Sequence, residues 1–109
     1  MLLSSVNSLL FAFGDTGQEF KKWHMYYVYL LLSEKDSRFY TGSTNNLQRR
    51  LQEHNSGNVM STKNRRPLQI IYYEACINEK DAQQREKYLK SGMGKRYLKN
   101  RLKRYLEDL

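Results

Sequence analysis

The chain has 109 residues, which is enough for one small domain with a modest core and too few for two. It carries 19 Lys and Arg against 11 Asp and Glu, and this formal net charge of +8 favours a polyanionic partner, nucleic acid before an anionic membrane. The single cysteine, Cys76, excludes an internal disulfide and a cysteine-based zinc finger, and it fits a reducing, cytoplasmic setting.

Residues 1–24 differ in composition from everything that follows them. Their apolar run at residues 9–13 is much shorter than the roughly 20 residues of a membrane span. The segment also lacks the basic start and the cleavage site of a signal peptide. Met25 stands directly before the first strongly patterned strand. We therefore predict that residues 1–24 are a loosely attached extension, translated from an upstream start codon, and that the domain occupies residues 25–109.

The pattern of the remaining chain predicts the element order β-β-α-β-α-α. Two β-rich runs separated by a polar stretch predict a hairpin, a third run predicts another strand, and the apolar spacing elsewhere is helical. The predicted strands are residues 25–32, 38–43 and 68–75, and the predicted helices are residues 45–55, 79–90 and 95–109. This order predicts a small α+β domain, in which helices flank a three-stranded, mainly antiparallel sheet.

The last predicted helix has one apolar stripe and is otherwise strongly basic. Residues 91–94, "SGMG", are expected to end the helix before it. The stripe consists of Leu98, Leu102, Tyr105 and Leu109. If this stripe packs on the domain, no apolar face is left for lipid, so we expect no membrane binding.

Three ionisable residues fall on helix faces that should be buried. Arg50 and His54 lie on the apolar side of the helix at 45–55, and Glu86 lies on the apolar side of the helix at 79–90. Burial of such groups is costly unless each finds a partner, a metal ion or a ligand phosphate. Three of them directed toward one sheet suggest a cleft.

Each of these residues also has a purely structural interpretation. Arg50 and Glu86 could form a buried salt bridge, and His54 could be a hydrogen-bonded core residue or a cation at a helix C-terminus. Tyr29 and Tyr40, on the two strands of the hairpin, could simply pack across the strands. Together, however, the five residues also suit metal-assisted attack on a phosphodiester, which needs a carboxylate for a hard cation, a guanidinium for the phosphate and a group that activates water.

Short motifs in the same order along the chain resemble the GIY-YIG nuclease superfamily. They are "YVY" at 27–29, "YTG" at 40–42, "LQRRLQEHN" at 47–55 and "REKYLK" at 85–90. The resemblance covers residues 25–104 and is greatest to the small stand-alone bacterial members, which are similar to the amino-terminal nuclease domain of the excision-repair endonuclease. It implies a metal-dependent DNA endonuclease, directed by DNA structure more than by sequence, that acts in repair or recombination with Mg²⁺ or Mn²⁺.

The resemblance also implies a role for each candidate residue. Glu86 would hold the metal ion and Arg50 would stabilise the charged phosphate. Tyr29 would take the proton from water or orient the water, with His54 as the final proton acceptor, and Tyr40 would position the phosphate. Because a phenol is a weak base at neutral pH, this role requires Arg50 and the cation to lower the pKa of Tyr29.

Basic residues are dense between positions 85 and 104, where Glu86 is the one acid, and the loop "TKNRRP" adds more. We expect them to bind DNA mainly through its phosphates, and any protein partner is left open. The expected contacts are Lys63, Arg65, Arg66, Lys95, Arg96, Lys99, Arg101 and Lys103. Two alternatives remain, an ordinary solvated face and a non-catalytic nucleic-acid-binding module of the same fold.

Overall fold

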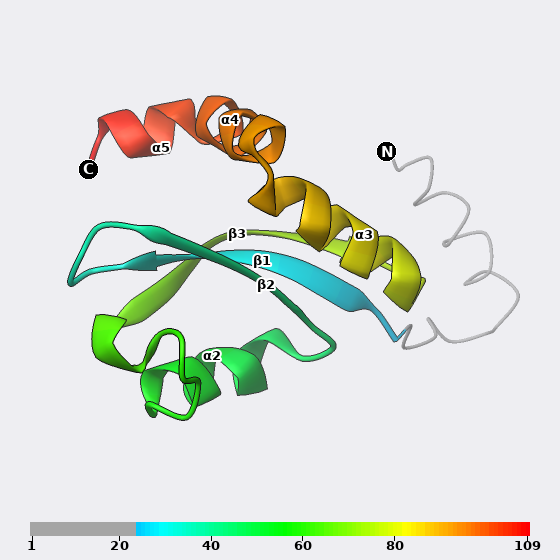
Figure 1. Ribbon diagram of the computed structural model, residues 1–109, viewed down its shortest axis with the longest axis horizontal. Helices are drawn as coiled ribbons and strands as arrows, with labels where there is room; N and C mark the ends of the chain where they lie inside the picture. The colour runs from blue at the N-terminus through cyan, green and yellow to red at the C-terminus, as the bar shows by residue number, and fades with distance from the viewer. Residues whose placement is uncertain (1–23) are drawn as a thin grey trace, which may run out of the picture.

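Three antiparallel strands with helices on both faces form the part of the chain that the computed structural model describes, residues 24–109 (Figure 1). The expected extension at residues 1–24 lies, except for its last residue, outside the described residues. The elements are β1 (Tyr26–Ser33), β2 (Phe39–Thr44), α2 (Leu47–Asn55), the short 3₁₀ helix η1 (Lys63–Arg65), β3 (Leu68–Cys76), α3 (Glu79–Lys90), α4 (Gly92–Arg101) and α5 (Lys103–Glu107). The α+β class and the order β-β-α-β-α-α are confirmed, with the last predicted helix divided into two.

The sheet has the strand order β2-β1-β3, and both pairings are antiparallel. In the register, Tyr29 of β1 lies opposite Gly42 of β2 on one side and Tyr73 of β3 on the other. The central strand is therefore enclosed by its neighbours, while β2 and β3 form the two edges of the sheet. The edge at β2 is the one that carries the candidate site.

Helices cover the sheet on both faces, α2 on one and α3 with α4 on the other (Figure 1). Since successive strand residues point to opposite faces, β1 supplies side chains to two separate cores. The core beneath α3 and α4 contains Val28, Leu30, Ala82, Leu89 and Leu98. The core beneath α2 contains Tyr29, Leu31 and Leu68, with Leu47 and Leu51 of α2 packed against it. A tyrosine thus occupies a core position that faces α2.

Asparagine side chains fix the starts of α2 and α3, as their positions in the sequence predict. The Asn46 side chain accepts a hydrogen bond from the backbone N–H of Arg49, and the Asn78 side chain accepts from those of Lys80 and Asp81. These caps set the helical phase that turns Arg50, His54 and Glu86 toward the sheet.

The prediction that "SGMG" ends the helix before it is confirmed, since α3 ends at Lys90 with Ser91 as its C-cap, but the next helix begins at Gly92 and not at residue 95. The Ser91 side chain accepts a hydrogen bond from the Gly94 N–H and so caps α4. A Cβ at Gly94 would collide with the backbone of Tyr88 and Leu89, so a glycine is needed where α4 folds back against α3. The sharp turn brings α4 over the sheet beside β2.

The predicted apolar stripe of the last helix is shorter than expected. Leu98 is buried and Leu102 packs on the same core, but α4 ends there and α5 leaves Leu109 69% exposed. In the described residues, no helix combines the length and the apolar character that a membrane crossing requires.

Candidate active site

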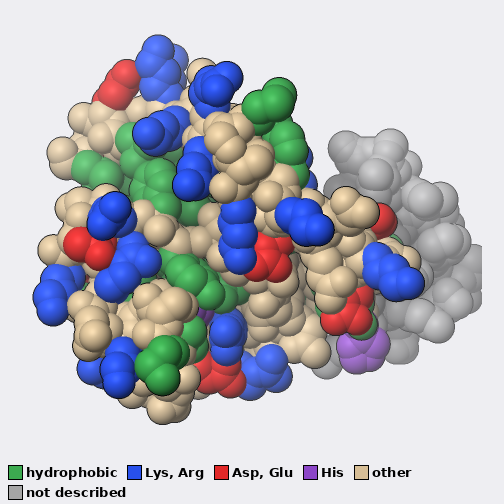
Figure 2. Space-filling view, viewed as in Figure 1, with side chains coloured by type: hydrophobic (Ala, Val, Ile, Leu, Met, Phe, Trp, Pro, Cys, Tyr) green, Lys and Arg blue, Asp and Glu red, His purple; other side chains and the backbone are tan. Residues whose placement is uncertain are grey.

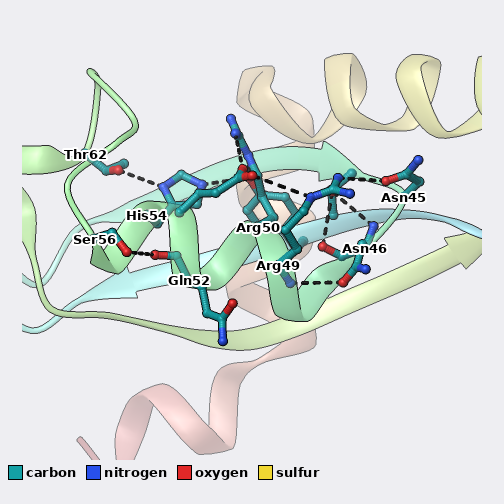
Figure 3. Close-up of polar contacts among 11 residues, drawn as sticks. Asn45, Asn46, Arg49, Arg50, Gln52, His54, Ser56 and Thr62 are labelled. Atoms are coloured by element: carbon teal, nitrogen blue, oxygen red, sulfur yellow. Dashed lines mark hydrogen bonds and ion pairs between the residues drawn. The ribbon is translucent and has the colours of Figure 1, made fainter.

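A chain of hydrogen bonds links three buried side chains beneath the sheet. The Tyr29 hydroxyl lies 2.8 Å from Nε2 of His54, and Nδ1 of His54 lies 2.7 Å from Oγ1 of Thr62. Thr62 belongs to the loop after α2 and lies beside the imidazole ring (Figure 3). His54 and Thr62 are 0% exposed and Tyr29 is 2% exposed. The His54 ring is therefore held at both nitrogens and shielded from water.

A neutral histidine carries one ring proton, on either Nδ1 or Nε2. Which nitrogen carries it sets the direction of the hydrogen bonds from Tyr29 to Thr62. With the proton on Nδ1, the ring donates to Thr62 and the Tyr29 hydroxyl donates to Nε2. Arg50 favours this arrangement, because its Nε–H already donates to the Tyr29 oxygen at 3.4 Å. We assign this tautomer, in which the phenol proton points at a nitrogen that can receive it.

The environment keeps His54 neutral. Burial, and then the nearby Arg50 guanidinium, lower the pKa of His54 from 6.5 to about 4. A helix-terminal cation, one of the structural interpretations, does not fit this environment. The other interpretation, a hydrogen-bonded core histidine, does fit, and it is compatible with a proton acceptor at neutral pH.

The same burial acts against ionisation of Tyr29. Desolvation raises the pKa of its phenol, and this effect outweighs the opposing hydrogen bond and charge of Arg50. Arg50 therefore lowers the pKa of Tyr29, as expected, but by less than burial raises it. The phenol is protonated at neutral pH and acts through its hydrogen bond to His54.

Arg50 bridges the buried network and the surface. Its Nη1 donates to Oε1 of Glu53 at 2.9 Å, while its Nε faces Tyr29. These two partners, Glu53 first, raise the pKa of Arg50, so the guanidinium is always charged. The alternative interpretation of Arg50 and Glu86 as a buried salt bridge is wrong, since each residue pairs with a neighbour on its own helix.

Tyr40 completes the aromatic surroundings of the histidine. Its ring centroid lies 5.1 Å from that of His54 in an edge-on arrangement and 6.5 Å from that of Tyr29. Aromatic packing of the two tyrosines across the strands is thus present. The role of Tyr40 in positioning a phosphate stays a prediction.

Glu86 approaches the same strand edge from the other face of the sheet. Its Oε1 accepts a hydrogen bond from Oγ of Ser43 at 2.7 Å, and its Oε2 lies 2.8 Å from Nζ of Lys90. The side chain is 21% exposed. Ser43 follows Gly42, the residue against which the Tyr29 phenol lies, so Glu86 and Tyr29 meet the β2 edge at adjacent residues.

The absence of a side chain at Gly42 leaves room for the Tyr29 phenol against the edge strand β2. A Cβ at this position would lie 2.5 Å from the Tyr29 hydroxyl oxygen and 2.7 Å from Cζ of the ring, closer than real contacts allow. The glycine of the "YTG" motif is therefore required by space. Gly42, Ser43 and Thr62 were not among the expected site residues, and only Gly42 carries a signal, its place in the motif.

The carboxylate of Glu86 supplies the kind of oxygen ligand that a hard cation takes. The described residues contain no group of three or more His, Cys, Asp and Glu side chains able to hold a metal ion. Mg²⁺ commonly uses one or two carboxylates and completes its shell with water and phosphate oxygens. A half-buried carboxylate next to a hydroxyl fits this mode, provided that Lys90 gives up its bond to Oε2.

The structure distributes the expected DNA contacts over several places on the surface (Figure 2). Lys95 and Lys99 line a hollow of about 840 Å³ together with Arg65, whose guanidinium is already bonded to Asp36 at 2.7 Å. The pKa of Asp36 is lowered to about 2, and the hydrogen bond from Arg65 is the largest of several causes. Arg65 therefore holds the turn of the hairpin.

The other expected contacts lie elsewhere on the surface. Lys63 and Arg66 line a second hollow of about 420 Å³, where Arg66 also donates to the Lys63 carbonyl. Arg101 and Lys103 line a third, of about 600 Å³, where α4 meets α5. Arg96 is exposed on α4.

Comparison with known proteins agrees with this geometry. Residues 25–105 match the family model described as the GIY-YIG catalytic domain. A UPF0213 protein of Clostridium perfringens is 45% identical over 67 residues, which are 61% of this chain and 71% of the relative. UPF0213 proteins of Oceanobacillus iheyensis and Pediococcus acidilactici are 41% and 40% identical, over 60% and 69% of this chain and 76% and 82% of theirs. No solved structure matches with statistical significance.

Proposed function

Because this chain belongs to the GIY-YIG family, we propose that it is a metal-dependent DNA endonuclease that hydrolyses phosphodiesters at the β2 edge of its sheet. The family is a nuclease superfamily, and the names of the UPF0213 relatives specify no activity. The observation that carries the proposal is the buried pair of Tyr29 and His54, in which a neutral imidazole lies 2.8 Å from the phenol beside a charged guanidinium. Such a pair can relay a proton without ionising the phenol in the resting protein.

The residues divide the work of hydrolysis among them. The Tyr29 oxygen orients the attacking water and accepts its proton as the phenol proton passes to Nε2 of His54. Thr62 holds the ring in place by accepting from Nδ1. The charge of Arg50 stabilises the phosphate as it gains negative charge in the transition state. Tyr40 positions the phosphate from the next strand.

Glu86 would hold a divalent cation, Mg²⁺ or Mn²⁺, on the other side of the edge strand. When bound, such an ion supplies charge stabilisation for the leaving oxygen. Ser43 would hold the carboxylate in its orientation through the bond to Oε1. Nucleic acid, cut according to its structure during repair or recombination, is the proposed substrate, because the net charge of +8 favours phosphate contacts over base reading.

The test is cleavage of labelled single-stranded, duplex and branched DNA with Mg²⁺ or Mn²⁺. Glu86→Gln removes the charge of the ligand with little change in shape, and Glu107→Gln on α5 is a matched control at an exposed site. We expect metal-dependent cutting that falls by about 100-fold or more in Glu86→Gln and is unchanged in Glu107→Gln. Salt-sensitive binding without cutting, equal in the natural protein and both variants, would overturn the proposal in favour of a non-catalytic binding module.

A further inference from the structure

A groove runs between β2 and α4 on the face of the sheet that carries Glu86. We call it the α4–β2 groove; it has a volume of about 840 Å³. Its apolar floor is the half-buried ring of Phe39, with Leu30 and Leu98 buried beneath it, and its basic rim comes from Arg38, Lys90, Lys95 and Lys99. Figure 2 shows Lys and Arg side chains gathered on both sides of a hydrophobic patch in this region. The groove thus combines an apolar floor with a cationic border.

The charge of this border is poorly balanced by acids of the groove itself. The one acid that lines it, Asp36, is bonded to Arg65 at 2.7 Å and 3.4 Å. The remaining rim cations are all exposed; Lys90 is paired with Glu86 of α3, while Arg38, Lys95 and Lys99 form no ion pair within residues 24–109. A partner that follows the groove must therefore be an anion along its length.

Lys90 connects the groove to the candidate active site. It lines the groove and lies 2.8 Å from the Glu86 carboxylate, which in turn is bonded to Ser43 of β2. A strand whose phosphate lies at Glu86 can therefore continue past Lys90 into the groove. Lys90 thus brings one end of the groove next to Glu86.

The apolar floor indicates what kind of nucleic acid fits. A duplex offers its phosphates outward and keeps its bases paired inside, so the exposed part of Phe39 would gain nothing from it. Single strands use both features, with phosphates on cations and bases on apolar or aromatic side chains. The groove volume of about 840 Å³ lies in the range of roughly 300–1,000 Å³ that is typical of ligand sites, which suits a few nucleotides.

We propose that the α4–β2 groove binds an unpaired nucleic-acid strand, so that the substrate is single-stranded or carries a single-stranded arm next to the bond that is cut. This inference rests on the proposed function for the position of the cut, but binding by the groove can be measured without cleavage. The chemical class of the ligand is a polyanion with exposed bases.

The experiment measures binding to the full chain without metal ions. Fluorescence anisotropy would follow labelled single-stranded DNA of about 12 nucleotides, within the roughly 4–16 nucleotides of known single-strand sites, and a duplex of the same length. Lys95→Gln/Lys99→Gln removes two exposed rim charges. Lys80→Gln/Lys87→Gln removes two exposed charges of α3 outside the groove and is the matched control.

We expect the natural protein to bind the single strand more tightly than the duplex. The rim variant should lose about tenfold or more in affinity for the single strand, and the control variant much less. The slope of log K against log salt should become shallower by about 1.4 for the rim variant, because each phosphate contact on a single strand contributes about 0.7. Equal affinity for both DNA forms, or equal losses in the two variants, would overturn the inference.

The cleavage assay separates this inference from the proposed function. Selective single-strand binding without cutting by the natural protein would support the groove and refute the nuclease. Efficient cutting of blunt duplex without loss in the rim variant would support the nuclease and refute the groove.

Discussion

The buried His54 makes a quantitative prediction about stability and pH. Its pKa is about 4 in the folded protein, against 6.5 for an ordinary histidine. The unfolded chain therefore takes up a proton before the folded protein does as the pH falls. Stability is full above about pH 6.5 and decreases toward pH 4, by about 3 kcal/mol in all and by about 2 kcal/mol at pH 5. His54→Gln should remove this dependence while keeping a polar side chain in the site.

The assay is urea unfolding followed by circular dichroism at several values between about pH 7.5 and pH 5. This window lies above the range in which lowered carboxylate pKa values, such as about 2 for Asp36, become important. His24→Gln is the control, because His24 is exposed and outside the site. We expect a pH-dependent loss of stability in the natural protein and in His24→Gln, and a flat profile in His54→Gln. A flat profile in the natural protein, or an unchanged slope in His54→Gln, would refute the neutral buried imidazole.

Two further changes test the surroundings of the same ring. Gly42→Ala places a methyl group within 2.7 Å of the Tyr29 ring. Cleavage should fall by about tenfold or more, and the free energy of unfolding should fall by roughly 1–3 kcal/mol. A variant with full activity would show that the phenol is not held against residue 42. Thr62→Val removes the acceptor from the protonated Nδ1 of His54, which should cost about 1–3 kcal/mol of stability and shift the ring proton to Nε2. Nitrogen-15 NMR of the imidazole reads that proton directly, and a proton on Nε2 in the natural protein would contradict the assignment.

The fold can be predicted from the sequence where the apolar residues recur at a clear helical or strand spacing. Helical phase alone turned Arg50 and His54 toward the sheet, and the asparagine caps located the starts of the helices. The start of α4 at Gly92 was missed because a serine next to glycines is compatible with both the end of one helix and the start of another. Only the packing of α4 against α3 decides between them.

The site was harder to predict than the fold, for a physical reason. Thr62 lies in a polar loop without periodicity, and nothing in its neighbours along the chain announces a buried hydroxyl facing His54. The pKa of Tyr29 depends on burial created jointly by the sheet and α2, which raises this pKa more than Arg50 lowers it, and the sequence shows only the charge of Arg50. The partner of Glu86 could not be predicted either: the sequence allowed a salt bridge to Arg50, but in the fold Glu86 bonds to Ser43 and Lys90.

The most direct test of the account is the single-turnover cleavage rate of Tyr29→Phe. This variant removes one hydroxyl, the atom that joins His54 and Arg50. Tyr73→Phe is the matched control, because Tyr73 lies opposite Tyr29 on β3 and its side chain is largely exposed. Loss of a positioned proton-transfer group predicts a rate lower by roughly 10²–10⁴-fold for Tyr29→Phe, with Tyr73→Phe close to the natural protein. A folded Tyr29→Phe protein that cuts DNA at the natural rate would contradict the account.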